Sequence, residues 1–148
     1  MSIFGDLKNM VTGGAATVSA AVVGEVKLGV PATVQVRAQA HANIEIDSVY
    51  VIIRLISTRD HAVRGEHGDE SETEYEEKLY LAGIQELVAG QTYSWETQFT
   101  IPVDKQVSKK RGEGWGGRFD YDWKLFAGLE RLGNDPDSGW QPFLVKAD

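Results

Sequence analysis

The sequence contains no cysteine, only four prolines and no long apolar run. Without cysteine, disulfides, thiolate zinc sites and cysteine nucleophiles are all excluded. Arg54 interrupts the most apolar stretch, which is therefore too short to span a membrane as a helix. No positive charge precedes an apolar run at the start of the sequence, so we expect no signal peptide. These absences favour a cytoplasmic protein.

Basic residues are also scarce, since 15 lysines and arginines stand against 22 aspartates and glutamates, for a formal net charge of -7. This excess of negative charge argues against nonspecific binding to nucleic acid or to anionic lipid. A length of 148 residues suits one domain with its own core. We therefore expect a soluble, acidic, globular domain.

Alternation of apolar and polar residues is the main pattern from residue 17 onward, and it predicts half-buried strands. Five stretches show it, and residues 77–84 and 140–146 add two candidate strands with noisier patterns. Seven or so strands, with no long helical period, predict an all-β protein, an antiparallel β-sandwich. The apolar members of the five stretches are Val18, Ala20, Val22, Val26 and Leu28; Val34, Val36, Ala38 and Ala40; Val49, Val51, Ile53 and Leu55; Tyr93, Trp95, Phe99 and Ile101; and Phe119, Tyr121, Trp123 and Leu125.

The first residues follow a different pattern. Ile3, Phe4, Leu7, Met10 and Val11 are spaced as on one face of a helix, and two glycines then end the run. The sequence predicts a short amphipathic helix or arm over residues 1–14, followed by one sandwich domain over residues 15–148. An apolar helix face this short needs a surface to lie on. Phe4 and Leu7 are therefore candidates for contact with a partner.

The stretch KKRGEGWGGR, from Lys109 to Arg118, combines a basic cluster with four glycines around one tryptophan. A phosphate-binding loop is not indicated, because the lysines precede the glycines and a strand, not a helix, is expected at Phe119. Nucleic-acid binding is not indicated either, because only one aromatic lies among the basic residues. The stretch is best interpreted as a long connection between strands. Its candidate contact residues are Lys109, Lys110, Arg111 and Trp115, the last as anchor.

A run of carboxylates between Asp60 and Glu77 is the second charged feature, with Arg64 as its only lysine or arginine. We interpret it as a solvated connection between strands. An alternative is that it docks against the basic stretch, within one molecule or between copies.

Metal ligands and catalytic groups are weakly indicated. His61 and His67 lie in the acidic run without the further ligands that a transition metal needs. The stretch Asn134–Gly139 faintly resembles a calcium loop, but it lacks the closing glutamate and is a good turn sequence. Asp120 and Asp122 share one strand face, which an outward polar surface explains. We expect no enzyme, no metal and no cofactor.

Two stretches carry a resemblance to a known family. The opening MSIFGDLKNMVTGGAATV, and the glycine turn and aromatic strand from Leu87 to Pro102, resemble bacterial sporulation-control proteins, which are arrestin-like. The resemblance covers about residues 1–103 and implies an immunoglobulin-like, arrestin-like sandwich. The family usually has Pro-Gly-Glu where this chain has Gly29-Val30-Pro31-Ala32, and it commonly carries two sandwich domains.

What the resemblance implies is a non-catalytic adaptor, scaffold or regulator that binds other proteins, or a second copy of itself, through sheet edges and end loops. The alternative function is a carbohydrate- or small-ligand-binding sandwich module. That alternative requires at least two exposed, coplanar rings among Trp115, Tyr121, Trp123 and Trp140.

Overall fold

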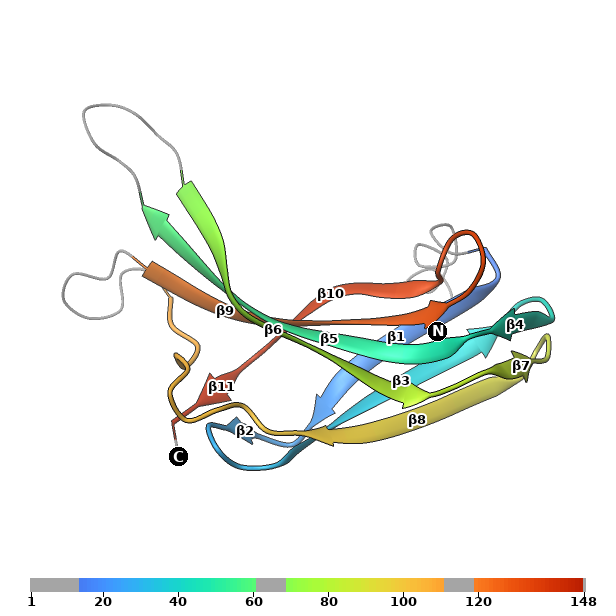
Figure 1. The fold of residues 1–148 in the computed structure, drawn as a ribbon, viewed down its shortest axis with the longest axis horizontal. Coiled ribbons are helices and arrows are strands. Elements are labelled where there is room, and N and C mark those ends of the chain that lie inside the picture. Colours follow the sequence, from blue (N-terminus) through green and yellow to red (C-terminus); the bar gives the residue numbers. More distant parts are fainter. Residues whose placement is uncertain (1–13, 61–68, 111–118, 148) are drawn as a thin grey trace, which may run out of the picture.

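The computed structural model describes residues 14–60, 69–110 and 119–147, which form strands joined by turns and irregular segments (Figure 1). No helix in these ranges is long and apolar enough to cross a membrane. The strands are β1 (Ala16–Val23), β2 (Val26–Lys27), β3 (Ala32–Ala40), β4 (Ile44–Ile46), β5 (Ser48–Asp60), β6 (Asp69–Ala82), β7 (Gln85–Leu87), β8 (Thr92–Phe99), β9 (Phe119–Glu130), β10 (Asp137–Phe143) and β11 (Val145–Lys146).

Two main sheets contain the seven long strands. The first has the order β1-β3-β8 and the second β10-β9-β5-β6, and every neighbouring pair within them is antiparallel. Two short pairs, β4 with β7 and β2 with β11, accompany them, and the second of these is parallel. The predicted antiparallel β-sandwich is therefore confirmed.

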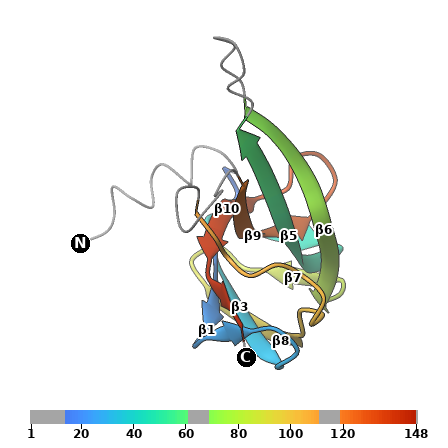
Figure 2. The same cartoon turned by 90° about the vertical axis from the view of Figure 1, so that its left-hand side faces the viewer.

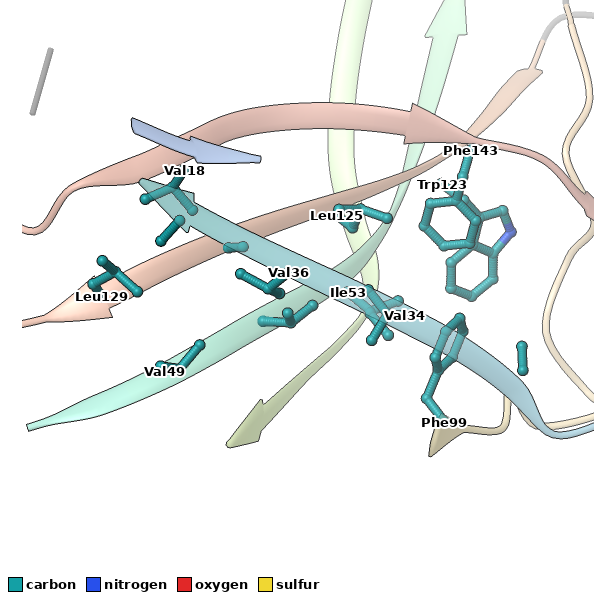
Figure 3. Packing of buried hydrophobic residues seen from close by; sticks show 14 of the residues in the cluster. Val18, Val34, Val36, Val49, Ile53, Phe99, Trp123, Leu125, Leu129 and Phe143 are labelled. Atoms are coloured by element: carbon teal, nitrogen blue, oxygen red, sulfur yellow. The ribbon is translucent and has the colours of Figure 1, made fainter. Parts of the chain in front are cut away.

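The core lies between the two main sheets and is built from alternate residues of their strands. Figure 3 shows Val34 and Val36 of β3 facing Ile53 of β5 and Leu125 of β9. Trp123 and Phe143 close one end of this layer, with ring centroids 6.1 Å apart. Because β-branched and aromatic side chains pack well on a pleated surface, the alternating stretches form these strands.

The sandwich is longer on one side than on the other. Strands β5 and β6 extend as a hairpin well past the ends of β3 and β8, as both views show (Figures 1 and 2). The inner face of β5 changes at this point from Ile53 and Leu55 to Ser57 and Arg59. The sequence of β5 thus becomes polar where the first sheet no longer covers the second.

Two predicted connections are shorter than expected. The acidic run from Asp60 to Glu77 is mostly strand, because β6 already begins at Asp69 and pairs with β5. An edge strand tolerates this many charges because its outer side faces water. The turn predicted over Asn134–Gly139 also ends earlier, since β10 begins at Asp137 and Ser138 donates a side-chain hydrogen bond to the carbonyl of Gly139. The helix predicted over residues 1–14 lies almost entirely outside the described residues.

The outer face of the four-stranded sheet is covered by its own long side chains. Arg54 donates to Glu76 over 2.7 Å, and its guanidinium lies 4.2 Å from the ring centroid of Trp140. Lys78 lies in the same way 4.4 Å from the ring centroid of Tyr50. The rings on this face are therefore already covered by cations of the same chain.

Candidate functional site

Along one side of the sandwich, the edge strand of one main sheet lies next to the edge strand of the other main sheet. Strand β1 is an edge strand of the first sheet, and β10 is an edge strand of the second. The two strands are in contact but are not hydrogen-bonded to each other as a ladder. No described strand pairs with the outer edge of either one. Edge strands carry unpaired backbone N–H and C=O groups, which are able to pair with another extended chain.

A groove of about 460 Å³ lies along this side of the sandwich, and we call it the edge groove. Its floor includes the buried side chains of Leu125 and Phe143, and its walls include Ala20 and Val22 of β1. Ala20 and Val22 are only half-buried, although they continue the alternation that begins with buried Val18. The remaining residues that line the edge groove are Ala21, Gly24, Glu25, Val26, Gln141, Pro142, Leu144 and Lys146.

A second groove of about 330 Å³ lies on the other side of the segment Pro142–Leu144, and we call it the lysine groove. The segment Pro142–Leu144 lines both grooves, so the two form one continuous surface. Leu144 is 66% exposed at the point where they meet. The lysine groove is also lined by Ser108, Lys109, Lys110, Tyr121, Asp122 and Trp123.

Backbone hydrogen bonds hold the walls of the lysine groove in place. The N–H of Lys109 donates to the carbonyl of Tyr121 over 3.1 Å, and the N–H of Tyr121 donates back over 2.8 Å. The N–H of Ser108 donates to the carbonyl of Val145, and the N–H of Val145 donates to the side-chain hydroxyl of Ser108, over 2.9 Å in each case. The indole N–H of Trp123 donates to the carbonyl of Gln106 over 2.8 Å. These hydrogen bonds fix the shape of the groove, and ligand-binding grooves are usually preformed.

The charged groups beside the edge groove are partly paired. Lys146 donates to the carboxylate of Glu25 over 3.0 Å, and this hydrogen bond is the main cause that lowers the pKa of Glu25. Both side chains are more than half exposed, so the pair is screened by solvent and contributes little to stability. The pair connects the turn after β1 with β11 at one end of the edge groove.

Among the candidate contact residues from the sequence, the structure brings Lys109 and Lys110 into the lysine groove. Arg111, Trp115, Phe4 and Leu7 lie outside the described residues, as do His61 and His67. The sequence did not single out Ala20, Val22 or Leu144 as contact residues. The available signal was the apolar alternation of β1, which continues beyond the part that the core covers.

The rings required by the carbohydrate alternative are placed unfavourably where the structure describes them. Trp123 is 1% exposed and belongs to the core. Trp140 is 36% exposed, but Arg54 lies over it and its ring is inclined 45° to that of Phe126. Tyr121 is half-buried at the wall of the lysine groove.

Metal-ligating groups do not gather in the described ranges, where no group of three or more histidines, aspartates or glutamates could hold a metal ion. His41, for which the sequence offers no partner, contacts Thr17, with 2.6 Å between Nε2 and Oγ1. Asp135, from the turn with calcium-loop character, instead accepts hydrogen bonds from the Tyr50 hydroxyl and the Arg131 N–H.

The fold is an arrestin-like β-sandwich, as the resemblance seen in the sequence implies. The chain is similar to the solved structure of Spo0M, the sporulation control protein from Bacillus subtilis, with a TM-score of 0.64 and 16% sequence identity. The similarity covers 91% of this chain and 51% of that one, so this chain spans about half the length of Spo0M. No protein-family model and no curated protein matches the sequence.

Proposed function

We propose that this protein is a non-catalytic adaptor or regulator that binds an extended segment of another protein along the edge groove. The observation that supports the proposal is that two features occur at the same place. The outer edge of β1 pairs with no strand in the described part of the chain, and apolar side chains that the core leaves half-buried line the groove beside it.

Strand addition explains why both features are needed. An extended peptide beside β1 gains main-chain hydrogen bonds, while alternate side chains of that peptide enter the groove and give specificity. The apolar walls formed by Ala20, Val22 and Leu144 favour aliphatic side chains there. The lysine groove adds Lys109 and Lys110 at the far side, which favours a peptide with carboxylates beyond its apolar part.

The structural neighbour supports a regulatory role, since it is described as a sporulation control protein. On this proposal the chain acts in a bacterial cytoplasm and needs no cofactor. Its partner is a protein, or a second copy of the chain that offers a strand of its own. The carbohydrate alternative has less support, because the described rings are buried or covered.

A single charged residue in the groove is expected to abolish this binding. The test is selection of a displayed library of random linear peptides on the immobilised protein and on its Leu144→Glu variant. We expect enriched peptides with aliphatic residues at alternate positions, and at least a tenfold loss of their affinity in the variant, because a charge would be desolvated against the apolar walls. Leu144 is 66% exposed, so its replacement leaves the core intact.

Leu132→Glu is the matched control. Leu132 is 96% exposed in the turn between β9 and β10 and lines neither groove, yet the substitution changes charge and hydropathy in the same way. Peptides that lose affinity equally in both variants, or that tolerate Leu144→Glu, would show that the edge groove is not the binding site.

A further inference from the structure

A polar basin of about 580 Å³ lies on the inner face of the β5–β6 hairpin, and it shares Tyr121 with the lysine groove but no residue with the edge groove. This part of the hairpin projects past the ends of β3 and β8 (Figures 1 and 2). Three glutamates of β6 line it, together with side chains of β5 and β9. The lining residues are Ser57, Arg59, Glu70, Ser71, Glu72, Glu74 and Tyr121.

The negative charge of the basin is only partly compensated. Arg59 is the only cation among the described residues that line it, and it lies directly across the β5–β6 ladder from Glu70, where opposite charges attract. Glu72 and Glu74 have no cationic partner among the described residues. Both carboxylates are exposed. Among the described residues, the basin thus presents two carboxylates that no cation pairs.

The hydroxyl of Ser57 gives an independent indication of a ligand. Ser57 lines the basin, yet only 6% of its surface is exposed. Its hydroxyl has no hydrogen-bond partner among the described residues, although buried hydroxyls are normally satisfied. Ser57 lies directly across the ladder from Glu72, so a group bound between them would reach both.

The chemistry of these acceptors selects the type of cation. No group of three or more carboxylates or histidines in the described ranges could hold a metal ion. An alkylammonium group is different, because it has three N–H donors and forms charge-assisted hydrogen bonds with single acceptors. Two carboxylates and one hydroxyl match those three donors in number. The volume of the basin lies in the range of ordinary small-ligand pockets.

We propose that this basin binds a primary alkylammonium group, held by Glu72, Glu74 and Ser57. Two sources share this chemistry, the lysine side chain of a partner protein and a free polyamine. The site is separate from the edge groove. Failure of the ammonium-binding test would therefore not contradict the proposed adaptor function, and failure of the adaptor test would not contradict this site.

The test is a titration of the full chain, followed by amide NMR shifts, at pH 7 and constant ionic strength. The probes are an end-blocked Gly-Lys-Gly peptide, spermidine, and tetramethylammonium, which has a positive charge but no N–H donor. We expect saturable shifts around residues 57 and 72 with the lysine peptide, with spermidine or with both, and none with tetramethylammonium. A response to the peptide alone assigns the site to protein lysines, and a response to spermidine alone assigns it to free polyamines.

Two variants and one control complete the experiment. Glu72→Gln with Glu74→Gln is expected to weaken binding at least about tenfold, since hydrogen bonds to charged groups are the stronger ones. Ser57→Ala is expected to weaken it about threefold or more. Glu86→Gln with Glu96→Gln removes the same charge from exposed positions outside the basin and is expected to change nothing. Equal weakening by this control, equal shifts with tetramethylammonium, or no saturable shift with either amine would overturn the proposal.

Discussion

Replacing Trp123 with alanine is expected to lower the free energy of unfolding by about 3–5 kcal/mol, the range found for large aromatic residues removed from cores. Trp123 is 1% exposed, and its ring lies 5.8 Å from that of Tyr75 and 6.1 Å from that of Phe143. The substitution leaves a cavity between the sheets. It also leaves the carbonyl of Gln106 without the indole N–H that now donates to it.

Trp140→Ala is the matched control, because it deletes the same side chain from the outer face of the same sheet. Trp140 is 36% exposed and contacts Arg54 and Phe126 only at the surface. We expect chemical denaturation to show a loss at least about 1.5 kcal/mol smaller for Trp140→Ala than for Trp123→Ala, given the dependence of such losses on burial. Equal losses would mean that Trp123 is not the centre of the packing described here.

Gly128→Ala is expected to be the second most damaging change, at about 2–4 kcal/mol, although it adds a single methyl group. Gly128 lies in β9 directly across from Tyr50 in β5, and the Tyr50 ring lies over the glycine. A methyl group at position 128 would fall on the ring and hydroxyl of Tyr50. Tyr50 is buried and its ring is stacked on Phe126, so moving the ring would disturb that packing.

The displaced Tyr50 would also lose a hydrogen bond. Its hydroxyl donates to the carboxylate of Asp135 over 3.0 Å. Burial, reinforced by this hydrogen bond, raises the pKa of Tyr50 well above its ordinary value. The phenol therefore stays protonated, and its contribution to stability is constant below the ordinary tyrosine pKa and declines only in strong alkali.

A double-mutant cycle tests whether contact with the Tyr50 ring is the reason why alanine at position 128 is destabilising. In a Tyr50→Ala background, Gly128→Ala is expected to lower the free energy of unfolding by less than about 1 kcal/mol, because the ring that the added methyl group would contact is absent. Gly83→Ala is the control, since a methyl group there meets nothing within 4 Å. If the cost of Gly128→Ala is unchanged without the Tyr50 ring, the steric explanation is wrong.

The architecture could be predicted from the sequence because its main signal is local. Alternation over Val49–Leu55 and Val34–Ala40 reports directly which side of each strand faces the core, and all eight of these apolar residues are buried. The strand beginning at Phe119 was predicted for the same reason and is confirmed. Period-two patterns need no knowledge of distant partners.

The acidic run shows where local reasoning fails. Asp69 to Glu77 have a composition typical of a solvated connection, yet they are part of β6, because β5 offers a paired edge along its full length. Strand formation here depends on β5 as the pairing partner. Composition alone does not report that partner.

The candidate site was predictable only in part. Lys109 and Lys110 were identified as contact residues, and they do line a groove. The larger groove is made by β1, β10 and the segment after it, which are more than a hundred residues apart in sequence. Ala20 and Val22 belong to the same apolar alternation as Val18, so only the relative position of the two sheets separates a core residue from a groove residue.

Amide hydrogen exchange, with and without a peptide selected on the edge groove, tests the adaptor account most directly. Strand addition predicts slower exchange in residues 16–23 of β1, because their outward amides gain hydrogen bonds. Residues 92–99 of β8 form the other edge of the same sheet and serve as the internal control. The account predicts protection of β1 and none of β8. Unchanged exchange in β1, or protection of β8 instead, would contradict it.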